Sequence, residues 1–199
     1  MLTKNQISSL VIDTLSGQEY GKNIAVLSLY CDYHDQDDQS AVNMVGSLLN
    51  QIALRAVGNV NEIQNAFKKS RAGGGSGLRL PEMRELFVKT IGSLERVYIC
   101  VDAMDELRPR HRSEFLRALQ QIIQESSNTR LFLTGRPHIR RELDKLLTKG
   151  VSTIHIVPSQ RDIVRFIDHR FETDLDPDAM TENLRNEITK LMLEKASDM

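Results

Sequence analysis

The segment Val97-Tyr-Ile-Cys-Val-Asp102-Ala-Met-Asp105-Glu106 decides the fold that we expect for this chain of 199 residues. Its first five residues are apolar or β-favouring, which is typical of a strand buried on both faces of a parallel sheet. Asp102 closes the strand, and Asp105 and Glu106 follow within the next turn. Acids at a strand end also start turns or cap a following helix, so a structural interpretation competes with a functional one. Three acids grouped behind a buried strand favour the functional interpretation.

Further strands and helices are expected on both sides of this segment. Apolar runs at 24–31, 130–134 and 152–157 predict strands. Apolar residues recur at helical spacing between them, and we expect helices over residues 5–15, 40–53, 81–94, 112–124, 138–148, 159–171 and 180–195. This alternation predicts an α/β fold with a parallel sheet, helices on both faces and a C-terminal helical extension. Ligands of such sheets bind at the carboxyl ends of the strands.

Two local features refine this expectation. Ile7, Leu10, Val11 and Leu15 form the apolar stripe of the first helix. Residues 58–80 show the weakest periodicity and contain Gly73-Gly-Gly-Ser-Gly77, so we expect a mobile surface loop there.

Composition excludes several classes of protein. The 26 Lys+Arg and 27 Asp+Glu give a net charge of −1, which argues against a nucleic-acid-binding protein. No apolar stretch approaches the ~18 residues of a membrane span, and residues 1–5 lack the build of a secretory signal. We therefore expect a cytoplasmic protein without a membrane partner. Cys31 and Cys100 both fall in expected strands and are interpreted as reduced core thiols.

A second chemical signal lies at the end of the expected strand 130–134. Thr134 stands at the strand tip, and Gly135-Arg136-Pro137 follows. A polar residue at a strand tip followed by a fixed guanidinium suits the sensing of a terminal phosphate, because Arg binds phosphate oxygens bidentately. The basic runs 108–112 and 138–141 either face phosphates or a partner subunit, or are solvated helix starts.

In this order, residues 97–107, 131–137 and 154–167 resemble the NACHT module of the STAND class of P-loop NTPases, in particular the fungal NOD-like receptor type with a nephrocystin-3-like N-terminal module. Residues 26–52 are similar to the second strand and helix of that module, and the resemblance covers most of residues 5–170. It implies a partial P-loop NTPase-like domain over residues 1–172, with a flexible loop at 70–80. Residues 173–199 would begin a helical lid region.

The resemblance implies a signal-transduction switch that binds and hydrolyses ATP or GTP with Mg²⁺ and forms homo- or hetero-oligomers with related NACHT proteins. Asp102 would hold Mg²⁺ through water. Asp105 and Glu106 would position or activate the hydrolytic water, and which of the two matters more stays open. Arg136 would read the γ-phosphate, with Thr134 beside it in the nucleotide site.

One departure from the family pattern limits this expectation. A P-loop NTPase needs G-x-x-x-x-G-K-[ST], because the loop amides cradle the phosphates and the Lys neutralises them. The chain contains no such run, and Gly17-Gln-Glu-Tyr-Gly21-Lys22-Asn23 has the wrong spacing and no hydroxyl at its last position. We therefore expect a fragment of a NACHT module that lacks the first strand and the phosphate loop and binds nucleotide weakly. Whether it is an enzyme stays open, and the alternative is a catalytically inactive protein-interaction module that retains the NTPase-like fold.

Overall fold

The computed structural model describes residues 4–18, 23–54, 60–72, 77–148, 150–156, 159–173 and 181–197. These residues fall into two compact units, one spanning Lys4–Val151 and one running from Ser152 toward the C-terminus. The first unit contains the sheet and every residue of the candidate site.

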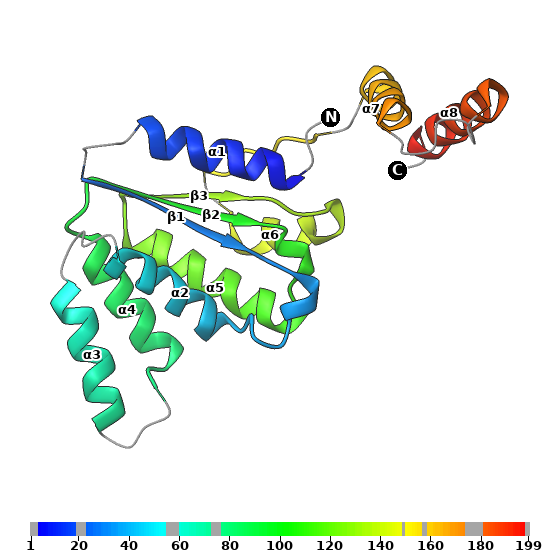
Figure 1. The fold of residues 1–199 in the computed structure, drawn as a ribbon. Coiled ribbons are helices and arrows are strands. Elements are labelled where there is room, and N and C mark those ends of the chain that lie inside the picture. The colour runs from blue at the N-terminus through cyan, green and yellow to red at the C-terminus, as the bar shows by residue number, and fades with distance from the viewer. Residues whose placement is uncertain are drawn as a thin grey trace. The chain divides into compact units, whose positions relative to one another are not determined.

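Three parallel strands form the sheet of the first unit (Figure 1). They are β1 (Ile24–Tyr30), β2 (Arg96–Asp102) and β3 (Thr129–Leu133), in the order β1-β2-β3. Tyr30 lies opposite Asp102, and Val101 lies opposite Leu133, so the carboxyl ends of all three strands meet at one edge. The α/β fold and the position of Asp102 at the end of the central strand are thus as predicted.

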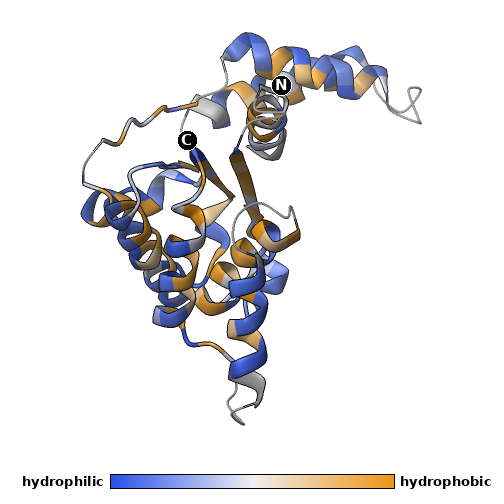
Figure 2. Ribbon diagram, turned by 90° about the vertical axis from the view of Figure 1, so that its left-hand side faces the viewer, coloured by the Kyte–Doolittle hydropathy of each residue, from blue (hydrophilic) through white to orange (hydrophobic). Residues whose placement is uncertain are grey.

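Helices cover both faces of the sheet. Helix α1 (Lys4–Gln18) lies on one face, and α2 (Ala41–Leu54), α4 (Leu80–Ile91) and α5 (Pro109–Glu125) lie on the other (Figure 1). The strands are largely hydrophobic, and the helices around them alternate between hydrophobic and hydrophilic residues (Figure 2). The fully buried side chains include Leu27, Leu48, Phe87, Ile99, Met104, Phe115 and Leu119.

The outer edge of β1 is closed by a side chain. Gln51 in α2 accepts a hydrogen bond from the backbone N–H of Ser28 at 3.0 Å and donates one to its carbonyl at 2.7 Å. The carboxamide thus replaces a neighbouring strand at this point, which removes two unpaired backbone groups from the edge.

The prediction of a mobile loop over residues 58–80 was wrong for much of that range. Helix α3 (Val60–Ala72) occupies it and packs against α2 and α4. Ile63 is 3% exposed, and Phe67, four residues later, packs on the core. This short apolar stripe is enough to fold the segment because α2 and α4 supply a surface for it. Residues 73–76, the centre of the expected flexible loop at 70–80, lie outside the described residues.

Three other predictions need correction. Residues 152–156 form no strand, and Ile154 and Ile156 are exposed, because no strand in the described part of the chain pairs with them. Residue 157 is not described. The helix expected over 138–148 is a short 3-10 helix, η3 (Pro137–Ile139), followed by α6 (Arg140–Leu146). Leu10 is 56% exposed instead of lying in the buried stripe of α1.

The C-terminal unit contains α7 (Gln160–Glu172) and α8 (Glu182–Ser197). Ser159 caps α7, since its hydroxyl accepts from the backbone N–H of Asp162 at 3.2 Å, as expected of a Ser before a helix. The two helices contact each other, and Arg185 of α8 donates to Asp168 of α7 at 2.8 Å. No helix among the described residues is long and apolar enough to cross a membrane.

Candidate functional site

Asp102 lies at the centre of a buried polar network. The residue is 2% exposed, and its Oδ1 accepts hydrogen bonds from the hydroxyls of Ser8 in α1 and Thr134 after β3, both at 2.5 Å. A buried carboxylate requires such donors, because charge-assisted hydrogen bonds offset the loss of hydration. The network joins α1, β2 and the end of β3 at one point.

The backbone turns sharply after Asp102. Ala103 has φ 54° and ψ 43°, the left-handed region that residues with a Cβ rarely adopt. Two hydrogen bonds hold it there. The N–H of Ala103 donates to the hydroxyl of Thr134 at 2.9 Å, and the N–H of Met104 donates to the carbonyl of Thr134 at 2.9 Å. The turn carries the 3-10 helix η2 (Met104–Glu106), which presents the other two acids.

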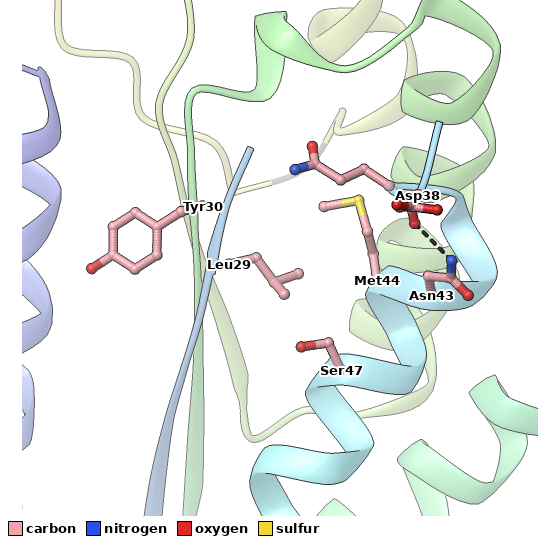
Figure 3. Close-up of a pocket in the computed structure, with 7 residues that line it drawn as sticks. Leu29, Tyr30, Asp38, Asn43, Met44 and Ser47 are labelled. Carbon is pink, nitrogen blue, oxygen red and sulfur yellow. Dashed lines mark hydrogen bonds between the residues drawn. The ribbon is translucent and has the colours of Figure 1, made fainter. Parts of the chain in front are cut away.

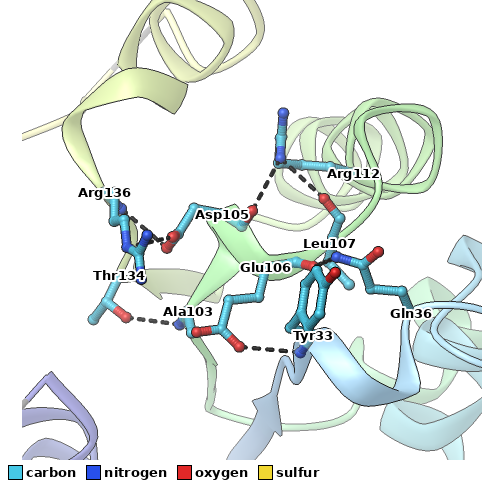
Figure 4. A network of polar contacts seen from close by, with 9 residues as sticks. All are labelled: Tyr33, Gln36, Ala103, Asp105, Glu106, Leu107, Arg112, Thr134 and Arg136. Atoms are coloured by element: carbon cyan, nitrogen blue, oxygen red, sulfur yellow. Dashed lines mark hydrogen bonds and ion pairs between the residues drawn. The ribbon is translucent and has the colours of Figure 1, made fainter.

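Asp105 and Arg136 form an ion pair (Figure 4). The Nε of Arg136 lies 3.3 Å from Oδ2 of Asp105, and the backbone N–H of Arg136 donates to Oδ1 at 3.0 Å. The side chain of Asp105 is 4% exposed and that of Arg136 is 66% exposed, so the carboxylate is fixed while the guanidinium reaches solvent. Gly135, just before Arg136, leaves room for the side chain of Ile139, because a Cβ there would lie 2.6 Å from its Cδ1.

Glu106 points to the loop after β1 and not to Arg136 (Figure 4). Its Oε2 accepts from the backbone N–H of Tyr33 at 3.1 Å, and its carbonyl accepts from Nε2 of Gln36 at 2.5 Å. Arg108 also pairs with Asp37 of this loop at 2.6 Å. Glu106 therefore has a visible role in holding the loop.

The thiol of Cys31 lies near all three acids. Its pKa is raised to about 12, mainly by burial and then by the negative charges of Asp102, Glu106 and Asp105. Burial raises the pKa of Cys100 to about 11. Both thiols are free and buried, which confirms the prediction of reduced core cysteines.

The structure brings together all five residues predicted from the sequence. Asp102 contacts Thr134, Asp105 contacts Arg136, and Glu106 lies in the same turn as Asp105. Their chemical roles stay predictions.

Sequence reasoning missed Ser8. It lies three residues before Val11 and seven before Leu15, on the inward side of α1, and a polar residue in that position signals a buried hydrogen-bond partner. It also missed the buried position of Arg112, which is 8% exposed although it lies in a basic run. Its spacing of three, four and seven residues before Phe115, Leu116 and Leu119 places it on the buried face of the helix and is the signal that could have found it.

A pocket of about 240 Å³ lies elsewhere, between the end of β1 and the start of α2 (Figure 3). Its lining residues are Leu29, Tyr30, Asp38, Gln39, Asn43, Met44 and Ser47. None of the five predicted site residues lines it, so it is distinct from the cluster around Asp102.

The polar cluster offers oxygen ligands of the kind that Mg²⁺ prefers. Asp102 supplies a carboxylate, and Ser8 and Thr134 supply two hydroxyls. Among the described residues, no three His, Cys, Asp or Glu side chains are grouped to hold a metal by themselves. These oxygens do not make an all-protein metal cage, and a Mg²⁺ ion held here would need further ligands from phosphate or water.

The polar cluster lies at the carboxyl edge of a parallel sheet, which is where α/β proteins bind their ligands. By its fold, the chain is an α/β protein with a parallel sheet. Comparison with known protein families identifies the family of the chain. The family described as "Nephrocystin 3, N-terminal" matches residues 3–136, more than half of the 199 residues. The chain belongs to this family. No curated protein and no solved structure matches the chain significantly.

Proposed function

We propose that this chain is part of a NACHT-type signalling switch that binds Mg²⁺ with ATP or GTP at the carboxyl edge of β2 and β3. Membership of the nephrocystin 3 N-terminal family supports this proposal. The observation that carries it is the convergence of Asp102, Ser8, Thr134 and the Asp105–Arg136 pair at one strand edge.

Asp102 would hold Mg²⁺ through water in this proposal, with the hydroxyl of Ser8 directed at the same oxygen. The metal would neutralise phosphate charge and orient the nucleotide. The chain itself keeps Asp102 fixed and largely away from bulk water, because Ser8 and Thr134 hold the same carboxylate oxygen.

Arg136 would bind the terminal phosphate. Its guanidinium is mostly exposed, and the carboxylate of Asp105 restricts its position before ligand binds. An anionic phosphate competes with that carboxylate for the guanidinium, since Arg binds both groups in the same bidentate manner. Release of Asp105 would then leave a carboxylate beside the phosphate that accepts a hydrogen bond from the attacking water.

The catalytically inactive interaction module is the second candidate. One observation favours it: Asp105 and Glu106 are both engaged within the chain, one with Arg136 and one with the N–H of Tyr33. The sequence also contains no phosphate-binding run of the G-x-x-x-x-G-K-[ST] type. In that case the polar cluster would stabilise the fold and partners would bind elsewhere on the surface.

Nucleotide titration separates the two candidates. The chain is titrated with a fluorescent ATP analogue and with the GTP analogue, in Mg²⁺ and in EDTA. We expect Mg²⁺-dependent binding that is lost in Asp102→Asn, a variant that keeps the shape of the side chain but removes its charge. Asp13→Asn, an exposed position on α1, is the matched control and should bind as the unmodified chain does.

Absence of binding by a folded chain up to millimolar nucleotide would refute nucleotide binding by this chain and support the inactive module. Binding that survives in Asp102→Asn would refute the placement of the site. Sedimentation with and without nucleotide tests the coupling to oligomerisation, and we expect a larger species only in the nucleotide-bound sample.

A further inference from the structure

We propose that Arg112 is a positioning residue that holds the acidic turn and helix α6 in the arrangement that pairs Asp105 with Arg136. This proposal rests on the proposed function, in which Asp105 and Arg136 are the groups at the terminal phosphate. Arg112 acts on this pair through the backbone of the turn and through α6.

Arg112 contacts the turn through backbone carbonyls (Figure 4). It lies in the first turn of α5, and its Nη1 donates to the carbonyl of Leu107 at 3.0 Å and to that of Asp105 at 3.4 Å. The second of these carbonyls belongs to the residue whose side chain pairs with Arg136. The guanidinium therefore limits how far the backbone of Asp105 can move.

The same guanidinium also holds α6. Its Nε donates to Oε2 of Glu142 at 2.7 Å, and the hydroxyl of Ser113 donates to the other oxygen of Glu142. Glu142 lies in the first turn of α6, three residues after η3 ends, and η3 begins directly after Arg136. Arg112 thus connects the two segments that carry the members of the Asp105–Arg136 pair.

The connection is well shielded from solvent. The side chain of Arg112 is 10% exposed and that of Glu142 is 24% exposed. Burial alone would raise the pKa of Glu142, but the hydrogen bonds from Ser113 and Arg112 and the positive charge of Arg112 lower it overall. Glu142 is therefore ionised at neutral pH, and removal of either partner leaves a shielded charge unpaired.

Only an arginine can make all three contacts. The three hydrogen bonds leave in different directions from Nε and Nη1 of one planar guanidinium. The ammonium of Lys carries all its donors on one nitrogen and does not reach the three acceptors together. An exposed arginine on the same helix supplies a matched control, since Arg110 pairs at the surface with Glu114 at 3.3 Å.

The test measures hydrogen exchange at the backbone amide of Arg136 by NMR, since this N–H donates to Oδ1 of Asp105. The variants are Arg112→Gln, Glu142→Gln, Arg110→Gln and, as a reference for the lost pair, Asp105→Ala, which leaves no acceptor for the N–H of Arg136. Exchange at Ile99, fully buried in β2, reports global stability in every sample. We expect exchange at Arg136 relative to Ile99 to rise about tenfold in Arg112→Gln and Glu142→Gln, as in Asp105→Ala, and to stay unchanged in Arg110→Gln.

A merely structural role would accelerate both amides together, and an unchanged ratio in Glu142→Gln or Arg112→Gln would overturn the proposal. If Arg112→Gln does not fold, Glu142→Gln decides alone, because it removes the carboxylate charge that binds Arg112 to α6 and leaves the two carbonyl contacts. A second measurement titrates Mg²⁺-ATP, with about tenfold weaker binding expected in Arg112→Gln. If the unmodified chain binds no nucleotide, the proposed function fails, and the exchange ratio still decides on Arg112.

Discussion

Replacement of Thr134 by Val tests how much the buried network around Asp102 stabilises the fold. The Thr134 hydroxyl makes two contacts, donating to Oδ1 of Asp102 at 2.5 Å and accepting from the N–H of Ala103 at 2.9 Å. Valine has nearly the same shape and keeps the methyl group. The substitution therefore removes the hydrogen bonds with little change in packing.

The magnitude follows from these two contacts. A hydrogen bond to a charged group contributes about 1.5–3 kcal/mol, and a buried N–H left without an acceptor costs about 1–3 kcal/mol. Ser8 still donates to the carboxylate in the variant, so Asp102 keeps one partner. Because one hydroxyl makes both contacts, the two losses do not add fully, and we expect destabilisation by about 3 kcal/mol. For a chain of this size that corresponds to a fall of ~6–12 °C in Tm.

Thermal unfolding followed by circular dichroism measures this change. Thr134→Ser is the matched control, because it keeps the hydroxyl and loses only a partly exposed methyl group, at a cost below ~1 kcal/mol. Urea unfolding of the same variants checks that the slope of the transition is unchanged. Equal Tm values for Thr134→Val and Thr134→Ser would refute the view that the hydroxyl supports the carboxylate and the turn.

Three other predictions concern different parts of the chain. Burial raises the pKa of Cys31 to about 12 and that of Cys100 to about 11, so iodoacetamide at about pH 8 should label neither thiol in the folded chain and both thiols in urea. Mass spectrometry measures the labelling, and labelling of the native chain within minutes would contradict the burial of the thiols. Gln51→Ala should lower stability by about 1–3 kcal/mol and increase light scattering on heating, because it uncovers the backbone of Ser28. If the variant stays clear and melts like the unmodified chain, Gln51 does not protect the edge of β1. The pKa of Glu142 is lower in the folded chain than its unfolded value of 4.5, so the ionised carboxylate stabilises the fold above that pH. This stability is lost as the pH falls through the folded pKa. Between about pH 5 and about pH 3, Tm should therefore fall less in Glu142→Gln than in the unmodified chain. Parallel Tm curves for the two proteins would show that the pair does not contribute.

The strands and most helices were predictable because their signals are local. The apolar run before Asp102 predicts a buried strand wherever it is placed, and Pro81 with Glu82 marks a helix start in the sequence itself. Residues 152–156 show the limit of this reasoning. Their alternating apolar pattern is typical of a strand, but a strand also needs a hydrogen-bonding partner, and the pattern carries no information about one.

Helix α3 was missed for the opposite reason, since its weak pattern is compensated by the surface of α2 and α4. Five residues of the polar cluster were named from the sequence, but Ser8 and the pairing within the cluster were not, and the chemical roles stay predictions. That Asp105 pairs with Arg136 while Glu106 holds the loop after β1 depends on the direction of a turn that no spacing rule specifies.

The left-handed conformation of Ala103 has a consequence for how the three acids can vary. The turn at Ala103 joins Asp102, which meets two hydroxyls from the end of β2, to η2, where Asp105 meets a guanidinium and Glu106 meets an amide. A change of backbone at this single position would therefore move Asp105 and Glu106 together relative to Asp102. The acids are geometrically dependent on one another, and substitutions among them are expected to show epistasis even where their side chains do not meet.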